Sequence, residues 1–217
     1  MSSEQYRGGG LVLEAGAHDQ ILGTPMDFVA PEFMDVSMYL RPLENQGDEP
    51  MCAAYAVCCI AQGIAWKLTG QPEDFEEAPL YVRAKQIDGL PPGTLGTTEI
   101  AALKAAMDLG YLPPGTTWYR VPDYSSMRFA LHRTPWVIGG FSLHENWQPD
   151  QMAHGQIPDQ PRMSMIGAHE VALCGYTTTG HVVTANSWGW RWGDRGYGTM
   201  SGWSFQQDWL GGRAIEV

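Results

Sequence analysis

The most extended apolar stretch of the chain has the spacing and composition of a buried helix. Residues 51–68, MCAAYAVCCIAQGIAWKL, are small or apolar on every side and contain no proline. Pro50 stands directly before this stretch, where its missing N–H costs nothing, and Gly70 and Pro72 follow as terminators. The pattern therefore predicts a core helix over residues 51–68.

Two more helices are predicted in the first half of the chain. One covers residues 75–85, and a Gly/Pro-rich loop, DGLPPGTLGTT, follows it. The next covers residues 98–109, TEIAALKAAMDL, with Thr97 or Thr98 as its N-cap and Gly110 as its terminator. The first half of the chain is thus predicted to be mainly helical.

Beyond Pro113 the pattern changes to short β-branched and aromatic runs separated by turns, which is typical of strands. Such runs occupy residues 136–141, 170–176 and 181–188. Helices followed by strands predict an α+β fold with two lobes, a helical lobe at about 46–112 and a β-rich lobe at about 113–217. A polar, Gly-rich arm over residues 1–34 precedes them, and the loop at about 144–164 is long enough to be functional.

Charge and cysteine content narrow the classes of partner. The net charge of −11 argues against nucleic acid or an anionic membrane as the main partner. No run of about 18 apolar residues and no apolar signal-peptide core is present, so we expect neither a membrane span nor export. The cysteines form neither a disulfide framework nor a zinc motif, and they stand at positions 52, 58, 59 and 174. We expect a reduced cytoplasmic protein with no metal and no cofactor.

Cys52 stands at the start of the predicted core helix, and this position suggests a chemical role. The unpaired N–H groups and the positive end of the helix dipole would favour its thiolate there, and a nearby imidazolium would lower its pKa further. Cys58 and Cys59 lie farther along the helix without that advantage. The alternative is that Cys52 is only a small apolar core residue.

Two polar residues at strand ends complete a candidate thiol site. His169 stands immediately before the apolar run EVALCGY, behind two small residues that leave room for a ligand. Asn186 directly follows another apolar run and precedes Ser187 and Trp188. An amide oxygen would accept the N–H of a histidine and decide which ring nitrogen faces a thiol. A structural histidine and a core tryptophan cluster remain the alternatives.

These residues carry a resemblance to the papain-like (C1-type) cysteine peptidases. The three signature blocks are NQG at 45–47 with Cys52 following, GAHEVALCGY at 167–176 and NSWGWRWGDRGYG at 186–198. The last block matches N-S-W-G-x-x-W-G-x-x-G-Y at every fixed position, and the resemblance runs from about Asp35 to the C-terminus.

The resemblance implies a fold and a set of roles. The fold would be the two-lobe papain-like fold, with the active-site cleft between a helical lobe and a barrel-like β lobe. Cys52 would be the nucleophile, His169 its base, Asn186 the residue that orients His169, and Gln46 an oxyanion donor together with the Cys52 N–H. The substrate would be a polypeptide.

Three other positions are implied to lie at the substrate or over the site. Gly96 resembles the glycine-bearing edge along which a substrate backbone lies, and Trp188 would cover the bond between Asn186 and His169. Met51, with Pro50, replaces small residues of the family pattern and would narrow the substrate site.

The chain also departs from the family pattern. Glu49 occupies the position where the family pattern has a disulfide cysteine. Ala53 occupies the position where that pattern has a tryptophan with its bulky indole. His169 and Asn186 follow Cys52 by 117 and 134 residues, where the papain pattern has roughly 130–150. About 35 residues precede the mature-like start, fewer than the usual inhibitory propeptide. We therefore expect either that the enzyme needs no zymogen or that assembly or expression controls it. This suits a bacterial or phage cytosolic protein, one that could be packaged into a larger particle.

Three functions stay open on the sequence alone. The first is an active cysteine peptidase. The second is a catalytically inactive papain-like module with a structural or interaction role. The third is a thiol amidase or acyltransferase that acts on non-protein amides, peptidoglycan cross-links included, because the same nucleophile and partners would serve it.

Overall fold

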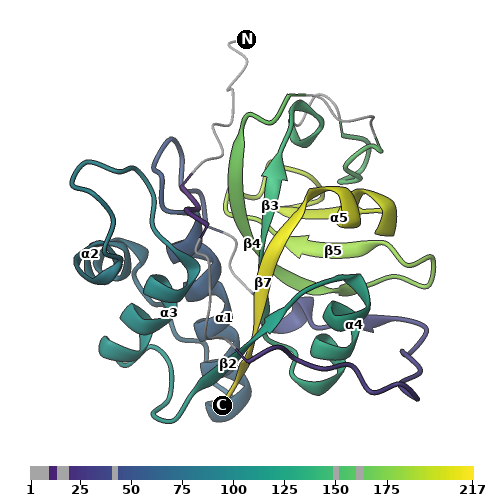
Figure 1. The fold of residues 1–217 in the computed structure, drawn as a ribbon, viewed down its shortest axis with the longest axis horizontal. Coiled ribbons are helices and arrows are strands. Elements are labelled where there is room, and N and C mark those ends of the chain that lie inside the picture. Colours follow the sequence, from purple (N-terminus) through teal and green to yellow (C-terminus); the bar gives the residue numbers. More distant parts are fainter. Residues whose placement is uncertain (1–9, 14–19, 41–43, 149–151, 160–163) are drawn as a thin grey trace.

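The structure is a computed structural model. It describes residues 10–13, 20–40, 44–148, 152–159 and 164–217. Three helices gather on one side of the molecule and an antiparallel sheet with two further helices on the other, as Figure 1 shows. This is the α+β arrangement of two lobes that the sequence predicts.

The core helix α1, Cys52–Thr69, begins at Cys52 and confirms the first prediction. No side chain of the described residues caps its N-terminus, and Gly70 ends it in the left-handed region at φ 71°. By length and composition alone α1 would be long enough and apolar enough to cross a membrane. However, 67% of it is buried inside the fold, and the core helix of a soluble protein passes the same test.

The two predicted helices beside α1 are also confirmed, with slightly different bounds. They are α2, Glu77–Ile87, and α3, Glu99–Asp108. Of the two candidate caps, Thr98 caps α3, because its hydroxyl accepts a hydrogen bond from the N–H of Ala101 at 3.1 Å. The cap fixes where the loop before α3 ends and the helix starts.

Within the described residues the sheet has seven strands in the order β2-β7-β3-β4-β5-β6, with β1 paired to β4, and these strands all pair antiparallel. The strands are β1 Met34–Asp35, β2 Thr117–Val121, β3 Val137–Leu143, β4 Gly167–Tyr176, β5 Val182–Ala185, β6 Tyr197–Met200 and β7 Trp209–Glu216. Two helices, α4 Tyr124–Arg133 and α5 Gly202–Asp208, accompany the sheet, with short 3-10 turns at Ser37–Tyr39 and Glu145–Trp147.

The three predicted strands are confirmed as β3, β4 and β5, but β5 is shorter than predicted. It ends at Ala185, so Asn186 and Ser187 leave the sheet. Strand β7 was not predicted, because its adjacent glycines Gly211 and Gly212 are more typical of a turn than of a strand. In the structure a Cβ on Gly212 would lie 2.3 Å from the carbonyl oxygen of Ile138, so the glycine permits close strand pairing.

Strand β4 is the wall that the two lobes share. Its odd-numbered residues Val171 and Leu173 enter a core enclosed by the sheet with α4 and α5. Its even-numbered residues Ala172 and Cys174 enter the core formed with α1 and α3. Because successive side chains of a strand point to opposite faces, this one strand fixes both cores.

The described residues of the predicted N-terminal arm, 10–13 and 20–33, have no helix or strand of their own, but they contact the folded core. Leu11 forms a parallel bridge with Thr97, next to α3, and Ile21 forms one with Arg120 in β2. The neighbouring Leu22 is buried at 3% exposure. These bridges join segments about 90 residues apart in sequence, which local patterns do not reveal.

We expect Gly175→Ala to destabilise the fold by at least about 2 kcal/mol. Gly175 has φ 140°, and a Cβ there would lie 1.9 Å from the carbonyl oxygen of Met34, which would break the pairing of β1 with β4. Gly23→Ala is the matched control, since no atom of the described part of the chain lies within 4 Å of its Cβ position. Denaturant unfolding measures both variants, and equal losses would contradict this account.

Candidate active site

Three of the four predicted catalytic residues are joined by one run of hydrogen bonds. His169 Nε2 lies 2.7 Å from Asn186 Oδ1, and the Ser187 N–H donates to the same oxygen at 2.8 Å. The Ser187 hydroxyl then donates to Gln46 Oε1 at 2.5 Å. Residues from the loop before α1, the start of β4 and the end of β5 are thus held together.

The Asn186 amide decides the protonation of the His169 ring. The Ser187 N–H is a donor and needs an acceptor, so the oxygen of Asn186 must point toward it. That oxygen accepts from His169 as well, which places the ring proton on Nε2. His169 Nδ1 is therefore left as the basic nitrogen, and it has no hydrogen-bond partner among the described residues.

Indole rings enclose the His169 imidazole. Trp188 lies with its ring centroid 4.6 Å from that of His169, and Trp147 meets the imidazole edge-on at 6.2 Å. Trp192 stacks on Trp147 and donates its indole N–H to the Trp147 carbonyl at 2.9 Å. Trp188 is 1% exposed, so in this arrangement it covers the site from behind and offers no surface to a substrate.

Cys52 lies beside the start of β4. The backbone N–H of Glu170, the residue after His169, faces the Cys52 sulfur, as do the N–H groups of Cys52 and Ala53 at the start of α1. Burial nevertheless dominates and raises the pKa of Cys52 to about 12. The thiol is therefore neutral in this arrangement, against the expectation of a thiolate at the helix start.

A cluster of three buried ionisable side chains that the sequence analysis missed reaches Cys52 through Glu170. The Arg213 guanidinium on β7 pairs with the Glu99 carboxylate at the start of α3 at 2.8 Å, which ties the two lobes together. Glu170 is buried beside them, and burial together with the Glu99 charge holds its pKa well above the usual range. An acidic residue, Glu170, at the start of the apolar run EVALCGY was the available signal.

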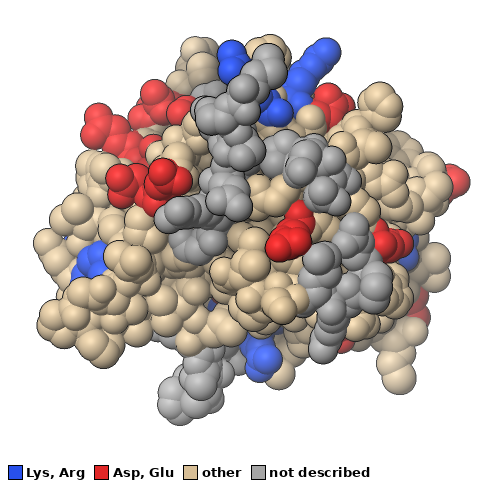
Figure 2. Space-filling model, turned by 90° about the horizontal axis from the view of Figure 1, so that it is seen from above, with Lys and Arg blue, Asp and Glu red and all other residues tan. Residues whose placement is uncertain are grey.

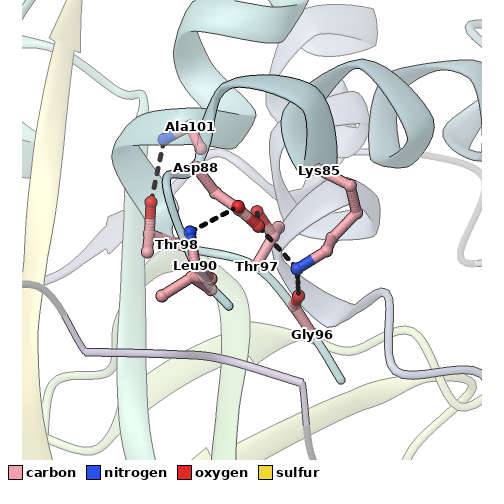
Figure 3. Close-up of polar contacts among 7 residues, drawn as sticks. All are labelled: Lys85, Asp88, Leu90, Gly96, Thr97, Thr98 and Ala101. Atoms are coloured by element: carbon pink, nitrogen blue, oxygen red, sulfur yellow. Dashed lines mark hydrogen bonds and ion pairs between the residues drawn. The ribbon is translucent and has the colours of Figure 1, made fainter. Parts of the chain in front are cut away.

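The loop before α3 has an edge at Gly96 and Thr97 that the side chains of Lys85 and Asp88 hold in place, as Figure 3 shows. Lys85 bridges the Asp88 carboxylate at 2.7 Å and the Gly96 carbonyl at 3.0 Å. Asp88 also accepts hydrogen bonds from the Leu90 N–H at 3.0 Å and the Thr97 hydroxyl at 3.2 Å. Burial acts to raise the pKa of Asp88, but these donors outweigh it and hold that pKa below its usual value.

Two predicted substrate residues remain. Gly96 lies at this edge, and Met51 lies at the start of α1. Gly96 has φ 79°, and a Cβ there would lie 2.0 Å from the carbonyl oxygen of Gly10. The backbone pairing at the edge is made by Thr97, the next residue, which the sequence analysis did not select for this role. Met51 is partly buried and packs against the core of α1.

We expect His169 to make the protein lose stability in mild acid. Burial lowers the pKa of His169 to about 4, although its bond to Asn186 opposes the shift. Between that pH and about 6.5 the unfolded chain binds the extra proton, so stability falls as pH drops through this window, by up to roughly 3 kcal/mol.

Denaturant unfolding at pH 7 and pH 4.5 measures this loss, and the His169→Gln variant should lack most of it. The exposed His132, changed to Gln, serves as the control and should keep the loss of the unmodified chain. An unchanged pH dependence in His169→Gln would contradict the burial of a neutral imidazole.

No protein-family model matches this sequence, and no curated protein matches it. Solved structures do. Xylellain, a cysteine protease from Xylella fastidiosa, aligns with a TM-score of 0.77 and 21% identity over 97% of this chain and 96% of that one. ProCathepsin B S9 from Trypanosoma congolense aligns with a TM-score of 0.74 and 13% identity, over 97% and 87% of the two chains.

A recombinant stem bromelain precursor aligns with a TM-score of 0.73 and 17% identity, over 100% of this chain and 80% of that chain. The three proteins share this arrangement of helices and sheet across almost the whole chain, although few residues are identical. The resemblance that the signature blocks suggest therefore extends to the three-dimensional structure, and the chain has the papain-like fold of cysteine proteases.

Proposed function

We propose that the protein is a cysteine-type peptidase in which Cys52 is the nucleophile and His169 its base. The observation that carries the proposal is the bond of His169 Nε2 to Asn186 Oδ1 at 2.7 Å. It leaves Nδ1 as the basic nitrogen at the position on β4 where the neighbouring N–H faces the Cys52 sulfur. A nucleophile, a base and an orienting group are the three parts that thiol catalysis needs.

The reaction follows from these parts. His169 Nδ1 takes the Cys52 proton as the sulfur attacks the peptide carbonyl carbon, and then returns that proton to the amine as the C–N bond breaks. Nδ1 next takes a proton from water, whose oxygen attacks the thioester. The acid product leaves and the proton returns to the Cys52 sulfur.

Gln46 and the start of α1 would stabilise the oxyanion. Ser187 fixes the Gln46 amide by donating to its oxygen, and the amide nitrogen donates one of its two N–H groups to the Glu49 carbonyl at 2.8 Å. The second N–H stays available for a developing negative charge. The backbone N–H of Cys52, in the first residue of α1, is the other donor, since no carbonyl inside the helix pairs with it.

A polypeptide is the substrate we propose, because structural neighbours of the chain are cysteine proteases. The net charge of −11 disfavours acidic polymers as substrates. Figure 2 shows acidic side chains gathered on the helical side of the face that it presents. We therefore propose that substrates with basic or neutral segments bind better than strongly acidic ones.

A second candidate function is a non-catalytic module, and one observation favours it. Cys52 and His169 are each 0% exposed, so neither contacts solvent in this arrangement. In an inactive protein the two residues would serve only as packing residues of the core. Cys52 mutagenesis separates the two functions, because only the catalytic account gives the sulfur a role that alanine does not fill.

We expect Cys52→Ala to reduce the hydrolysis of a peptide library at least about 1000-fold while the thermal unfolding stays close to that of the unmodified protein. Cys58→Ala is the matched control, since Cys58 is a buried cysteine on the same helix. It should retain turnover within about twofold. Full turnover by Cys52→Ala would remove the sulfur from the mechanism.

We expect Asn186→Ala to lower kcat by roughly 10- to 1000-fold, a part of what acid–base catalysis contributes, because Asn186 orients His169 and does not react. Asn186→Asp keeps the acceptor oxygen and adds a charge that favours the imidazolium. It should recover part of kcat and shift the pH–rate profile upward. A loss in Asn186→Ala as complete as that in Cys52→Ala would show that orientation is not its role.

A further inference from the structure

Glu170 is a buried carboxyl that the proposed mechanism does not use. It follows His169 on β4, and its side chain is enclosed at 1% exposure. No N–H or hydroxyl group of the described residues forms a hydrogen bond with either of its oxygens. A buried carboxylate normally accepts several hydrogen bonds or pairs with a cation. The surroundings of Glu170 are therefore those of a neutral acid.

The charged groups around Glu170 already balance without it. Arg213 on β7 donates to the Glu99 carboxylate on α3 at 2.8 Å, and the two residues are 6% and 9% exposed. One guanidinium and one carboxylate carry no net charge. An ionised Glu170 would add a second negative charge to this buried group, and removing a charge from water without its own partner is unfavourable. One bound proton prevents this.

The two carboxyls offer a place for that proton. The Glu170 side chain lies within hydrogen-bonding reach of the Glu99 side chain. Two carboxylates repel each other at this separation, whereas an acid and a carboxylate share a proton in a strong hydrogen bond. Glu99 is the better carboxylate, because Arg213 pairs with it. The Glu170 acid is therefore the donor and Glu99 the acceptor.

Cys52 is the other ionisable group that faces Glu170. It comes from α1, whereas β3 places Gly140 opposite Glu170. A negative charge on Glu170 raises the pKa of Cys52, because two like charges disfavour each other inside a protein. The Glu170 backbone N–H acts in the opposite direction, since it faces the sulfur. A protonated Glu170 keeps the N–H and removes the repulsion.

We propose that Glu170 is a positioning residue for the Cys52 thiolate: it stays protonated, donates to Glu99 and so keeps negative charge away from the sulfur. Its effect on catalysis rests on the proposed peptidase function, but the proton does not. When Glu170 releases the proton to solvent at alkaline pH, a negative charge arises beside Cys52. The thiolate is then disfavoured, so Glu170 limits activity on the alkaline side.

Glu170→Gln tests the proton through stability, because glutamine has the shape of the neutral acid and does not titrate. The unfolded chain releases this proton near pH 4.3 and the folded chain retains it, so the unmodified protein loses stability relative to the variant as the pH rises. Denaturant unfolding at pH 5 and pH 7 gives both folding constants. We expect the ratio of the variant's constant to that of the unmodified protein to rise roughly 10- to 100-fold. In this ratio the contribution of His169 cancels.

Glu73→Gln is the matched control, because Glu73 is exposed. Its folding constant should keep the same ratio to that of the unmodified protein at both pH values. A ratio for Glu170→Gln that is also constant would overturn the proposal, because it would show that folding does not hold the proton.

Infrared spectroscopy at pH 7 detects the proton directly through the C=O stretch of a carboxylic acid. We expect this band in the difference between the unmodified protein and Glu170→Gln. Glu99→Gln should lack the band as well, because Glu170 would then ionise and pair with Arg213. A band that persists in Glu99→Gln would contradict a proton shared between the two carboxyls.

The pH dependence of kcat/KM on a peptide substrate tests the effect on Cys52. The alkaline limb should move to higher pH in Glu170→Gln and stay in place in Glu73→Gln. An unmoved limb in Glu170→Gln would overturn the positioning role. A stability ratio that rises with pH in a protein that cleaves no peptide would support the proton and contradict the peptidase function.

Discussion

Strand β4 has to bury both of its faces, and the rest of the structure depends on this constraint. Its alternation places Val171 and Leu173 in one core and Ala172 and Cys174 in the other. Small residues on the second face let α1 pack directly against the strand. The start of α1 and the start of β4 are thereby brought to the same point, so the geometry of the candidate site follows from packing.

The same packing creates a conflict between stability and reactivity. Burial keeps the His169 imidazole and the Cys52 thiol neutral, whereas catalysis needs them to exchange a proton. The hydrogen bonds of Asn186 and the N–H groups at the start of α1 favour the reactive forms but are outweighed here. Access of water and substrate would change that balance.

Much of the candidate site could be predicted from the sequence because its signals are local. A cysteine at a helix start, a histidine at a strand start and an asparagine after a strand each stand in a recognisable pattern. The contact between Leu11 and Thr97 has no such pattern, since a single backbone bridge constrains no side chain. The buried Glu170 and its neighbours were missed for a related reason, because Glu99 and Arg213 meet only through the tertiary fold.

The central claim is that Cys52 is a thiol activated by His169, and covalent capture tests it most directly. The folded full-length protein would be incubated to completion under reducing conditions with an epoxysuccinyl thiol-protease inhibitor, and the adduct located by mass spectrometry. The account predicts one adduct at Cys52 that is lost in His169→Ala. No adduct at all, or an adduct at Cys52 that persists in His169→Ala, would contradict it.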